Sequence, residues 1–353
     1  MISSSPYDFH CHGIGNFDFT HPSDIVLEQI QSSLYTENVN SIITIYLLRN
    51  NIEDFEDFVA VYYDGKLSGK YPNIVGIALE GPFLSSIGGT PRRGCWTPTI
   101  NEWLRLFKLG HSGLIYIVIS PDAEIPAETD YPPNMIWIID NMLNNGVIPA
   151  LGHFQKDNPA ASAEKTRLIL EHVKNNYDIP IVTDHLFNDM PLNFKKAWRT
   201  FDELQNRTNE LQEILDANWT FNNMYETLGD VPATIIEYAR QGVVKVCVNF
   251  DGNHVDIEIC KKAIDLIGSE NLLLMTDRIQ SKVLGGQYLI EKFNNTLLYQ
   301  SDGIVAGGSQ SVMRLLANMM QCHIASSDIY NIAFKNPFDY LNTIHDYKNS
   351  IMT

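Results

Sequence analysis

The stretch IVGIALEGP, residues 74–82, joins a run of apolar residues to one acid, Glu80, and then to a glycine and a proline. Continuous apolar runs of this length are typical of strands buried on both faces, as in parallel sheets. The chain repeats the arrangement, because other short apolar runs also end at a histidine or an acid. The carboxyl ends of parallel barrel strands meet at one face, where active sites form. The stretch therefore predicts both a fold and a site.

Eight apolar runs fit buried strands, and helical stretches separate most of them, as in repeated βα units. Eight is the strand number of a (β/α)8 barrel. We therefore predict an α/β fold, a single TIM-like barrel over residues 1–353. The predicted strands are Tyr7–His12, Ser41–Leu47, Ile74–Leu79, Leu114–Ile119, Val147–Leu151, Pro180–Thr183, Val243–Asn249 and Leu272–Thr276.

Two segments depart from this alternation. Residues from about Pro191 to Gln241 are too long for one crossover helix, and we interpret them as an insertion after strand six, at the top of the barrel. Residues Val283–Gln300 predict a hairpin with Asn294-Asn295 at its turn. The last barrel helix is expected over Ser309–Cys322.

Composition excludes several classes of partner. The net charge of −17, from 25 basic and 42 acidic residues, disfavours a nucleic-acid-binding surface. The five cysteines show no CxxC spacing and predict free thiols in a reducing compartment. We find no signal-peptide pattern and no apolar run long enough to span a membrane, so a cytoplasmic protein without a membrane partner is expected.

His10 and His12 lie at the end of the first predicted strand, followed by Gly13. Side chains alternate along a strand, so both imidazoles point to the same side and can face a metal in the barrel mouth. Two ordinary histidines near a strand end are the alternative. Their position favours ligation.

Glu80, His153 and His185 follow the third, fifth and sixth predicted strands. A carboxylate at the end of a buried strand needs a partner to offset its desolvation, and a metal or a basic side chain would serve. Neutral imidazole is a good ligand for zinc or ferrous iron. Singly, Glu80 fits a structural salt bridge equally well, and either histidine fits a structural role better. Together with the HxH pair they predict a metal centre.

Three further residues belong to the predicted site. Asp277 follows strand eight, where a carboxylate can accept a proton from water and pass it to a leaving amine. A structural role is its alternative. His254 follows strand seven and could reach the same mouth. Ser309 begins the last predicted helix, where it either helps to hold a substrate oxygen or caps the helix.

These motifs, in this order, resemble those of the N-acetylglucosamine-6-phosphate deacetylase family of the amidohydrolase superfamily. The resemblance runs from about Tyr7 to Asn336-Pro337. The motifs are DFHCHG at 8–13, LEGPF at 79–83, GH at 152–153, HLFNDM at 185–190, DGNHV at 251–255 and TD at 276–277.

The resemblance implies a distorted (β/α)8 barrel with one or two divalent metals, zinc or iron, and an amino-sugar substrate. By motif, Glu80, His153 and His185 match the principal metal ligands, and His10 and His12 match ligands of a second metal. Asp277 matches the catalytic acid-base and His254 a substrate-binding histidine. Asn188 and Asp189 match a segment that contacts the sugar phosphate. A homodimer is also implied.

Three departures from the family pattern concern the substrate and the domain content. The strands of a small β-sandwich domain, usual in the family at both ends of the chain, are expected to be missing. The family's phosphate-binding arginine is absent after Met190. The candidate replacements are Lys195, Lys196 and Arg199, and we predict Lys196 as the substrate-binding residue. Cys95 stands where the family has a histidine that assists the substrate carbonyl.

The predicted function is metal-dependent removal of an acetyl group from an N-acetylated amino sugar, such as N-acetylglucosamine-6-phosphate. One alternative is another amidohydrolase acting on N-acyl or cyclic amides. An anionic substrate of that kind would suit Arg92 or Arg93. The other alternative is a metal-binding barrel without turnover.

Overall fold

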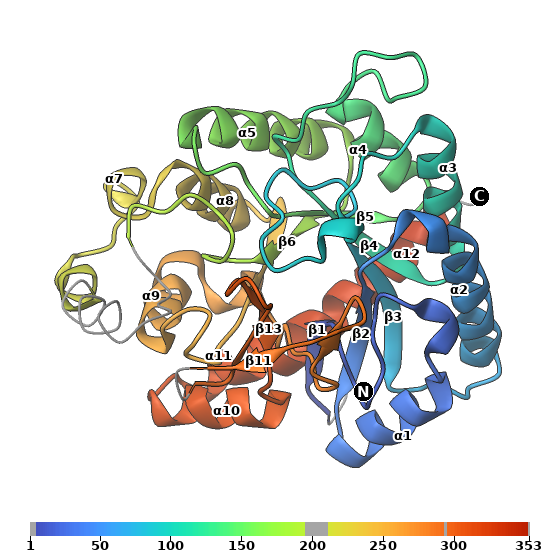
Figure 1. Ribbon diagram of the computed structural model, residues 1–353. Coiled ribbons are helices and arrows are strands. Elements are labelled where there is room, and N and C mark those ends of the chain that lie inside the picture. Colours follow the sequence, from blue (N-terminus) through green and yellow to red (C-terminus); the bar gives the residue numbers. More distant parts are fainter. Residues whose placement is uncertain (1–4, 195–210, 293–294, 352–353) are drawn as a thin grey trace.

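The computed structural model describes residues 5–194, 211–292 and 295–351. Eight parallel strands follow one another around a barrel in chain order, from β1 to β8 (Figure 1). The predicted (β/α)8 architecture is confirmed. The strands are β1 Tyr7–Cys11, β2 Asn40–Ile45, β3 Ile74–Glu80, β4 Leu114–Ile119, β5 Ile148–Leu151, β6 Ile181–His185, β7 Val244–Val248 and β8 Leu272–Leu274.

The barrel closes through irregular backbone pairing between β1 and the segment that follows β8. The His12 amide donates to the Arg278 carbonyl at 2.9 Å, and the Asp277 amide donates to the His10 carbonyl at 3.1 Å. Gly13 continues this contact as a bridge to Ile279. Because the first and last strands meet here, residues separated by most of the chain lie side by side at the barrel mouth.

Helices surround the barrel (Figure 1). Several begin at a side chain that accepts a backbone N–H of the first turn, which stabilises the free helix end. Thr99 and Glu102 form a capping box at α3, and Ser311 caps α10, so Ser309 is not the cap of this helix. The principal helices are α1 Leu27–Glu37, α2 Ile52–Leu67, α3 Ile100–Lys108, α4 Met135–Asn144, α5 Pro159–Asn176, α8 Asp230–Arg240, α9 Ile257–Ile267, α10 Val312–Gln321 and α12 Asn336–Ile351.

The segment between β6 and β7 contains the predicted insertion. Residues 195–210 of that segment lie outside the described residues. A short helix, α7 (Met224–Leu228), leads into α8, and α8 packs against α5 and α9 in the helical layer. The predicted range of about 191–241 therefore includes a helix of the barrel layer itself.

Additional short strands lie between β8 and α10. β9 (Val283–Leu284) pairs with β10 (Gln287–Tyr288) through a turn at Gly285-Gly286. β11 (Ile290–Glu291), β12 (Leu297–Tyr299) and β13 (Val305–Gly308) form a separate antiparallel sheet. The region predicted as one hairpin thus contains two strand pairings. Asn294, placed at its turn, lies outside the described residues.

Candidate metal centre

The strand ends bring six predicted residues to the carboxyl-terminal face of the barrel, where all of them are buried. They form two groups of potential metal ligands that share Glu80. The first group is His10, His12, Glu80 and Asp277, and the second is Glu80, His153, Asp184 and His185.

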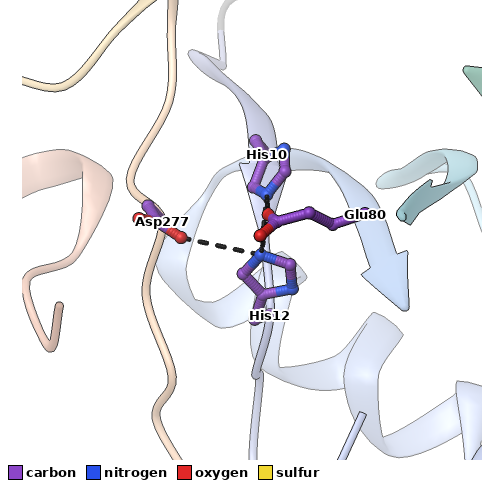
Figure 2. A group of neighbouring side chains, drawn as sticks. All are labelled: His10, His12, Glu80 and Asp277. Carbon is purple, nitrogen blue, oxygen red and sulfur yellow. Dashed lines mark hydrogen bonds and ion pairs between the residues drawn. The ribbon is translucent and has the colours of Figure 1, made fainter. Parts of the chain in front are cut away.

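Figure 2 shows the first group. The Nε2 atoms of His10 and His12 lie 2.7 Å apart, and both contact Oε2 of Glu80, at 2.9 and 2.8 Å. Oδ1 of Asp277 lies 3.6 Å from Nε2 of His12. The three nearest donor atoms therefore converge on one point, as the HxH spacing predicts.

The second group faces the other oxygen of Glu80. Nε2 of His153 lies 3.0 Å from Oε1 of Glu80 and 3.3 Å from Oδ2 of Asp184. Nε2 of His185 lies 3.2 Å from the same Asp184 oxygen. Thr90 donates a hydrogen bond to Oε1 of Glu80 at 3.1 Å. The two oxygens of one carboxylate thus serve two ligand groups.

The second group fits a divalent metal. Ligands that hold a tetrahedral ion at about 2.0–2.2 Å lie roughly 3.4 Å apart, close to the separations found here. Nε2 of His153 and both carboxylate oxygens of Asp184 are buried and make no hydrogen bond to a described residue. Since buried polar atoms in native proteins are almost always hydrogen-bonded, these atoms indicate a missing positive ligand.

Hydrogen bonds at Nδ1 orient the imidazole rings of His12 and His153. Nδ1 of His12 donates to the Thr44 carbonyl at 3.1 Å, and Nδ1 of His153 lies 3.0 Å from the Ser86 carbonyl. Each bond places the ring proton on Nδ1 and leaves the lone pair of Nε2 pointing into the site. This is the usual support of metal-binding histidines.

The charged groups of the site shift one another's pKa values. Burial by itself lowers the pKa of His10, but the negative charges of Asp184 and Glu80 outweigh it and raise the pKa to about 9. Burial raises the pKa of Glu80, but His12 and His153 hold that pKa well below its usual range. Protonated imidazoles thus compensate the buried carboxylates when no ion is bound.

Asp277 lies between the first group and His254. Oδ2 of Asp277 is 3.4 Å from Nε2 of His254, and Nδ1 of His254 lies 2.7 Å from Oδ2 of Asp251. The backbone amide of His254 also donates to Asp251, at 2.9 Å. Asp251 therefore fixes the orientation of the ring that faces Asp277.

Three site residues enter the mouth from left-handed backbone. The φ angles are +55° at His153, +41° at Asp189 and +52° at Asp277. Left-handed backbone is uncommon outside glycine, and it concentrates at functional sites. Gly88 packs above this region, where a Cβ atom would lie 2.7 Å from Oδ2 of Asp189 and 3.1 Å from Cε1 of His153.

A cavity of about 370 Å³ opens onto both ligand groups. Its volume lies within the range of small-molecule sites. Polar groups form its floor, and apolar residues of β12, β13 and the segment between them form one wall. The lining includes Tyr46, Glu80, Gly88, His153, Lys156, His185, Asn188, Asp189, His254, Asp277, Leu297, Ile304, Val305 and Ala306.

Solved structures share this architecture. An N-acetylglucosamine-6-phosphate deacetylase from Pasteurella multocida superposes with a TM-score of 0.67 at 14% identity, covering 97% of this chain and 77% of that one. The enzyme from Mycobacterium smegmatis, solved with N-acetyl-D-glucosamine-6-phosphate, gives 0.66 at 18% identity, with 97% and 78% covered. The Thermotoga maritima enzyme gives 0.65 at 14% identity, with 97% and 79% covered.

The chain has the fold of N-acetylglucosamine-6-phosphate deacetylases. No family model matches the sequence, and no curated protein matches it. Since the deacetylase structures are less than 20% identical to this chain, the likeness establishes the barrel and its topology. The chemistry of this chain must be argued from its own residues.

Not every predicted residue lines the cavity. Asn188 and Asp189 do, and Asp189 also contacts Nδ1 of His153 at 2.9 Å. Cys95 is half-buried outside the lining, and burial raises the pKa of its thiol to about 12. Ser309 is exposed, and its hydroxyl donates to the Thr296 carbonyl. Lys196 lies outside the described residues.

The sequence did not predict two residues at the site, Asp184 and Lys156. Asp184 directly precedes His185, and strict alternation along a strand would turn it away from the site. Lys156 follows His153 by three positions in a loop without a recognisable motif. The only signal for Asp184 was a charged residue inside an otherwise apolar strand.

Proposed function

We propose that this chain is a metal-dependent deacetylase that hydrolyses the acetamide of an N-acetylated amino sugar, with N-acetylglucosamine-6-phosphate as the first candidate. The observation that carries the proposal is the position of Asp277, beside the His10–His12–Glu80 group and on the wall of the cavity. The shared fold with deacetylases of this sugar phosphate supports it.

Divalent metal would be held by Glu80 with His10 and His12, and by Glu80 with His153 and His185. It would polarise the acetamide carbonyl and lower the pKa of water. We propose zinc or iron, which suit imidazole and carboxylate ligands. Asp277 accepts the proton of the attacking water and then donates it to the leaving amine. Its burial limits competition from bulk water for that proton.

His254 assists at the same face. With Nδ1 held by Asp251, its Nε2 points toward Asp277 and the cavity. We assign it a hydrogen bond to a substrate oxygen, which would also keep the substrate aligned with Asp277. The apolar wall formed by Leu297 and Val305 suits the acetyl methyl group or a sugar ring face.

Lys156 is the residue that we propose for the phosphate. Among the described residues that line the cavity it is the only lysine or arginine. Its side chain is 55% exposed, so its ammonium group is accessible, and it lies 2.5 Å from Oδ1 of Asp189. That ion pair anchors the lysine at the mouth while leaving N–H groups free for an anionic substituent.

The direct test is amine release from N-acetylglucosamine-6-phosphate and from N-acetylglucosamine, after reconstitution with zinc or ferrous iron. Turnover that is faster with the phosphorylated sugar is expected. Turnover of neither sugar by the metal-loaded protein would reject the proposal, and a panel of N-acyl amino acids and cyclic amides would then follow. Arg92 and Arg93, the residues suited to such anionic amides, are exposed and lie outside the cavity lining.

Two wider proposals accompany this function. We propose a homodimer, to be measured by light scattering, and a location in the cytoplasm, to be measured by fractionation. Among the described helices, none is long and apolar enough to cross a membrane.

A further inference from the structure

Asp184 is a buried acid whose charge is not accounted for by hydrogen bonds. It is 2% exposed, and neither of its carboxylate oxygens makes a hydrogen bond to a described residue. Burying a carboxylate is costly, so buried carboxylates are paired with charged groups or bind metals.

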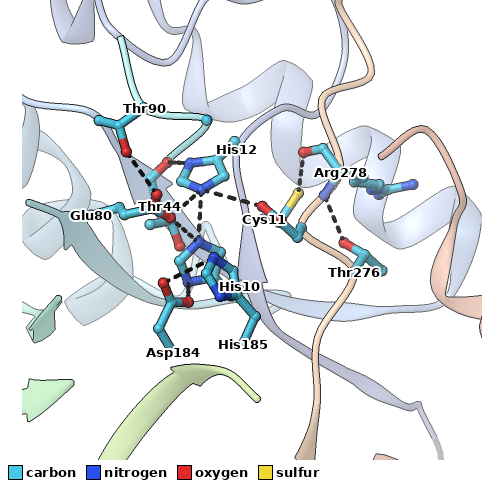
Figure 3. A network of polar contacts seen from close by, with 12 residues as sticks. His10, Cys11, His12, Thr44, Glu80, Thr90, Asp184, His185, Thr276 and Arg278 are labelled. Carbon is cyan, nitrogen blue, oxygen red and sulfur yellow. Dashed lines mark hydrogen bonds and ion pairs between the residues drawn. The ribbon is translucent and has the colours of Figure 1, made fainter. Parts of the chain in front are cut away.

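Three imidazoles surround this carboxylate, and Figure 3 shows two of them, those of His10 and His185. Oδ2 lies 3.3 Å from Nε2 of His153 and 3.2 Å from Nε2 of His185. Oδ1 lies 3.5 Å from Nδ1 of His10, whose other nitrogen belongs to the first ligand group. The two oxygens of Asp184 thus face the two groups, as the two oxygens of Glu80 do.

The fold makes room for Asp184 on the inner side. The pairing of β6 with β7 shifts register between Val182 and His185, which breaks the alternation of side chains at the strand end. Gly152, on the neighbouring strand end, has no side chain, and a Cβ atom there would lie 2.6 Å from Cβ of Asp184. Adjacent residues of one strand can therefore both reach the site.

We propose that Asp184 is a fourth metal ligand, which completes the group of Glu80, His153 and His185. This inference rests on the proposed metal centre and is independent of the substrate.

The proposal makes the two ion sites unequal. Four protein ligands complete the shell of a tetrahedral ion, which is the pattern of structural sites, whereas three ligands leave a position for water or substrate. With Asp277 retained as the proton acceptor, the first group supplies three ligands, His10, His12 and Glu80. The group with Asp184 is expected to hold its ion more tightly.

An alternative role for Asp184 is purely electrostatic, as the partner of protonated imidazoles. The two roles differ once metal is removed. Asp184 lies within 3.5 Å of nitrogen atoms of His153, His185 and His10, so an ion-pair role would stabilise the protein without metal. A ligand stabilises the loaded protein and not the empty one, whereas an ion-pair partner stabilises the empty one.

The first experiment is Asp184→Asn, with metal content measured by inductively coupled plasma mass spectrometry. Two ions per chain are expected in the wild type and one in the variant. The metal affinity of the group with Asp184 should fall at least 100-fold. Losing a residue that only supports a ligand costs about 100-fold at most. The matched control is Asp140→Asn, because Asp140 pairs with His172 on α4 and α5, on the outer helices.

Thermal melting separates a ligand from a structural residue. Metal should raise the melting temperature of the wild type more than that of Asp184→Asn, because the variant has lost a ligand of one ion. The inference is overturned if the variant keeps the wild-type metal content, if the wild type binds no more than one ion, or if metal raises the melting temperature of both proteins equally.

A second variant gives a direct spectroscopic readout. Asp184→Cys, reconstituted with cobalt, should show a thiolate-to-cobalt charge-transfer absorption that the wild type and Asp140→Cys lack. Its absence in a folded, cobalt-loaded variant would also count against ligation. None of these measurements uses turnover, so a failure of the proposed deacetylase activity would be seen separately.

Discussion

Replacing Asp277 by asparagine should lower kcat by about 10²- to 10⁴-fold while leaving the metal bound. General acid–base catalysis contributes a factor of this size, equal to about 2.7–5.4 kcal/mol of activation free energy. The upper part of the range is expected because Asp277 is only 5% exposed, so bulk water cannot readily replace it as proton acceptor. The neighbouring His254 is already oriented by Asp251.

Asparagine suits this position for a conformational reason. The φ angle of Asp277 is +52°, and asparagine tolerates left-handed backbone better than alanine does. The amide keeps the size and polarity of the carboxylate, so the loss of activity would report on proton transfer and not on folding.

The assay compares kcat, KM and metal content of wild type, Asp277→Asn and the remote Asp140→Asn on N-acetylglucosamine-6-phosphate. A kcat within tenfold of wild type at equal metal content would refute the role of Asp277 as proton acceptor. Loss of metal from Asp277→Asn would instead identify the residue as a ligand, which also contradicts that role.

Three more outcomes are expected. Although burial lowers the pKa of His10, Asp184 and Glu80 raise it to about 9, so the imidazole is protonated at neutral pH without metal. Metal binding should therefore release protons, and the apparent metal affinity should rise with pH up to about 9. Equal calorimetric heats of metal binding in buffers of different ionisation enthalpy would contradict this. Lys156→Met should raise KM for the phosphorylated sugar about tenfold or more and leave KM for N-acetylglucosamine unchanged; equal effects on both sugars would remove Lys156 from phosphate recognition. Burial lowers the pKa of Lys348 from 10.5 to about 7. The unfolded chain therefore binds more protons between these values, so the unfolding free energy should gain up to about 1.4 kcal/mol per pH unit from this group, and Lys348→Met should flatten that rise in denaturant titrations at pH 7 and 9.

The sequence was sufficient for the strands and for most residues of the candidate metal centre. Runs such as Leu114–Ile119 are buried throughout, as their uninterrupted apolar character predicts. Glu80 and His185 end their strands, so the rule that parallel strand ends converge was enough to group them. These inferences succeeded because they depend on local periodicity and on the direction of parallel strands.

The sequence was less informative where the register or the loops decide. Cys95 was placed at the substrate by motif position, but the loop after β3 carries it outside the cavity lining. The loop after β5 brings Lys156, the proposed phosphate-binding residue, to the cavity mouth, and the sequence does not indicate this position. Loop conformations depend on packing against distant segments, so sequence spacing does not reveal which cation reaches the site.

By itself, then, the order of apolar runs and terminal polar residues determined the barrel, the face of the candidate site and the residues from His10 to Asp277 that meet there. Tertiary structure alone decided that Glu80 serves two ligand groups with its two oxygens and that Asp184 turns inward beside His185. The physical reason is that a strand pattern specifies which residues end on one face. The register shift in β6 and the space left by Gly152 specify which atoms then come within bonding distance.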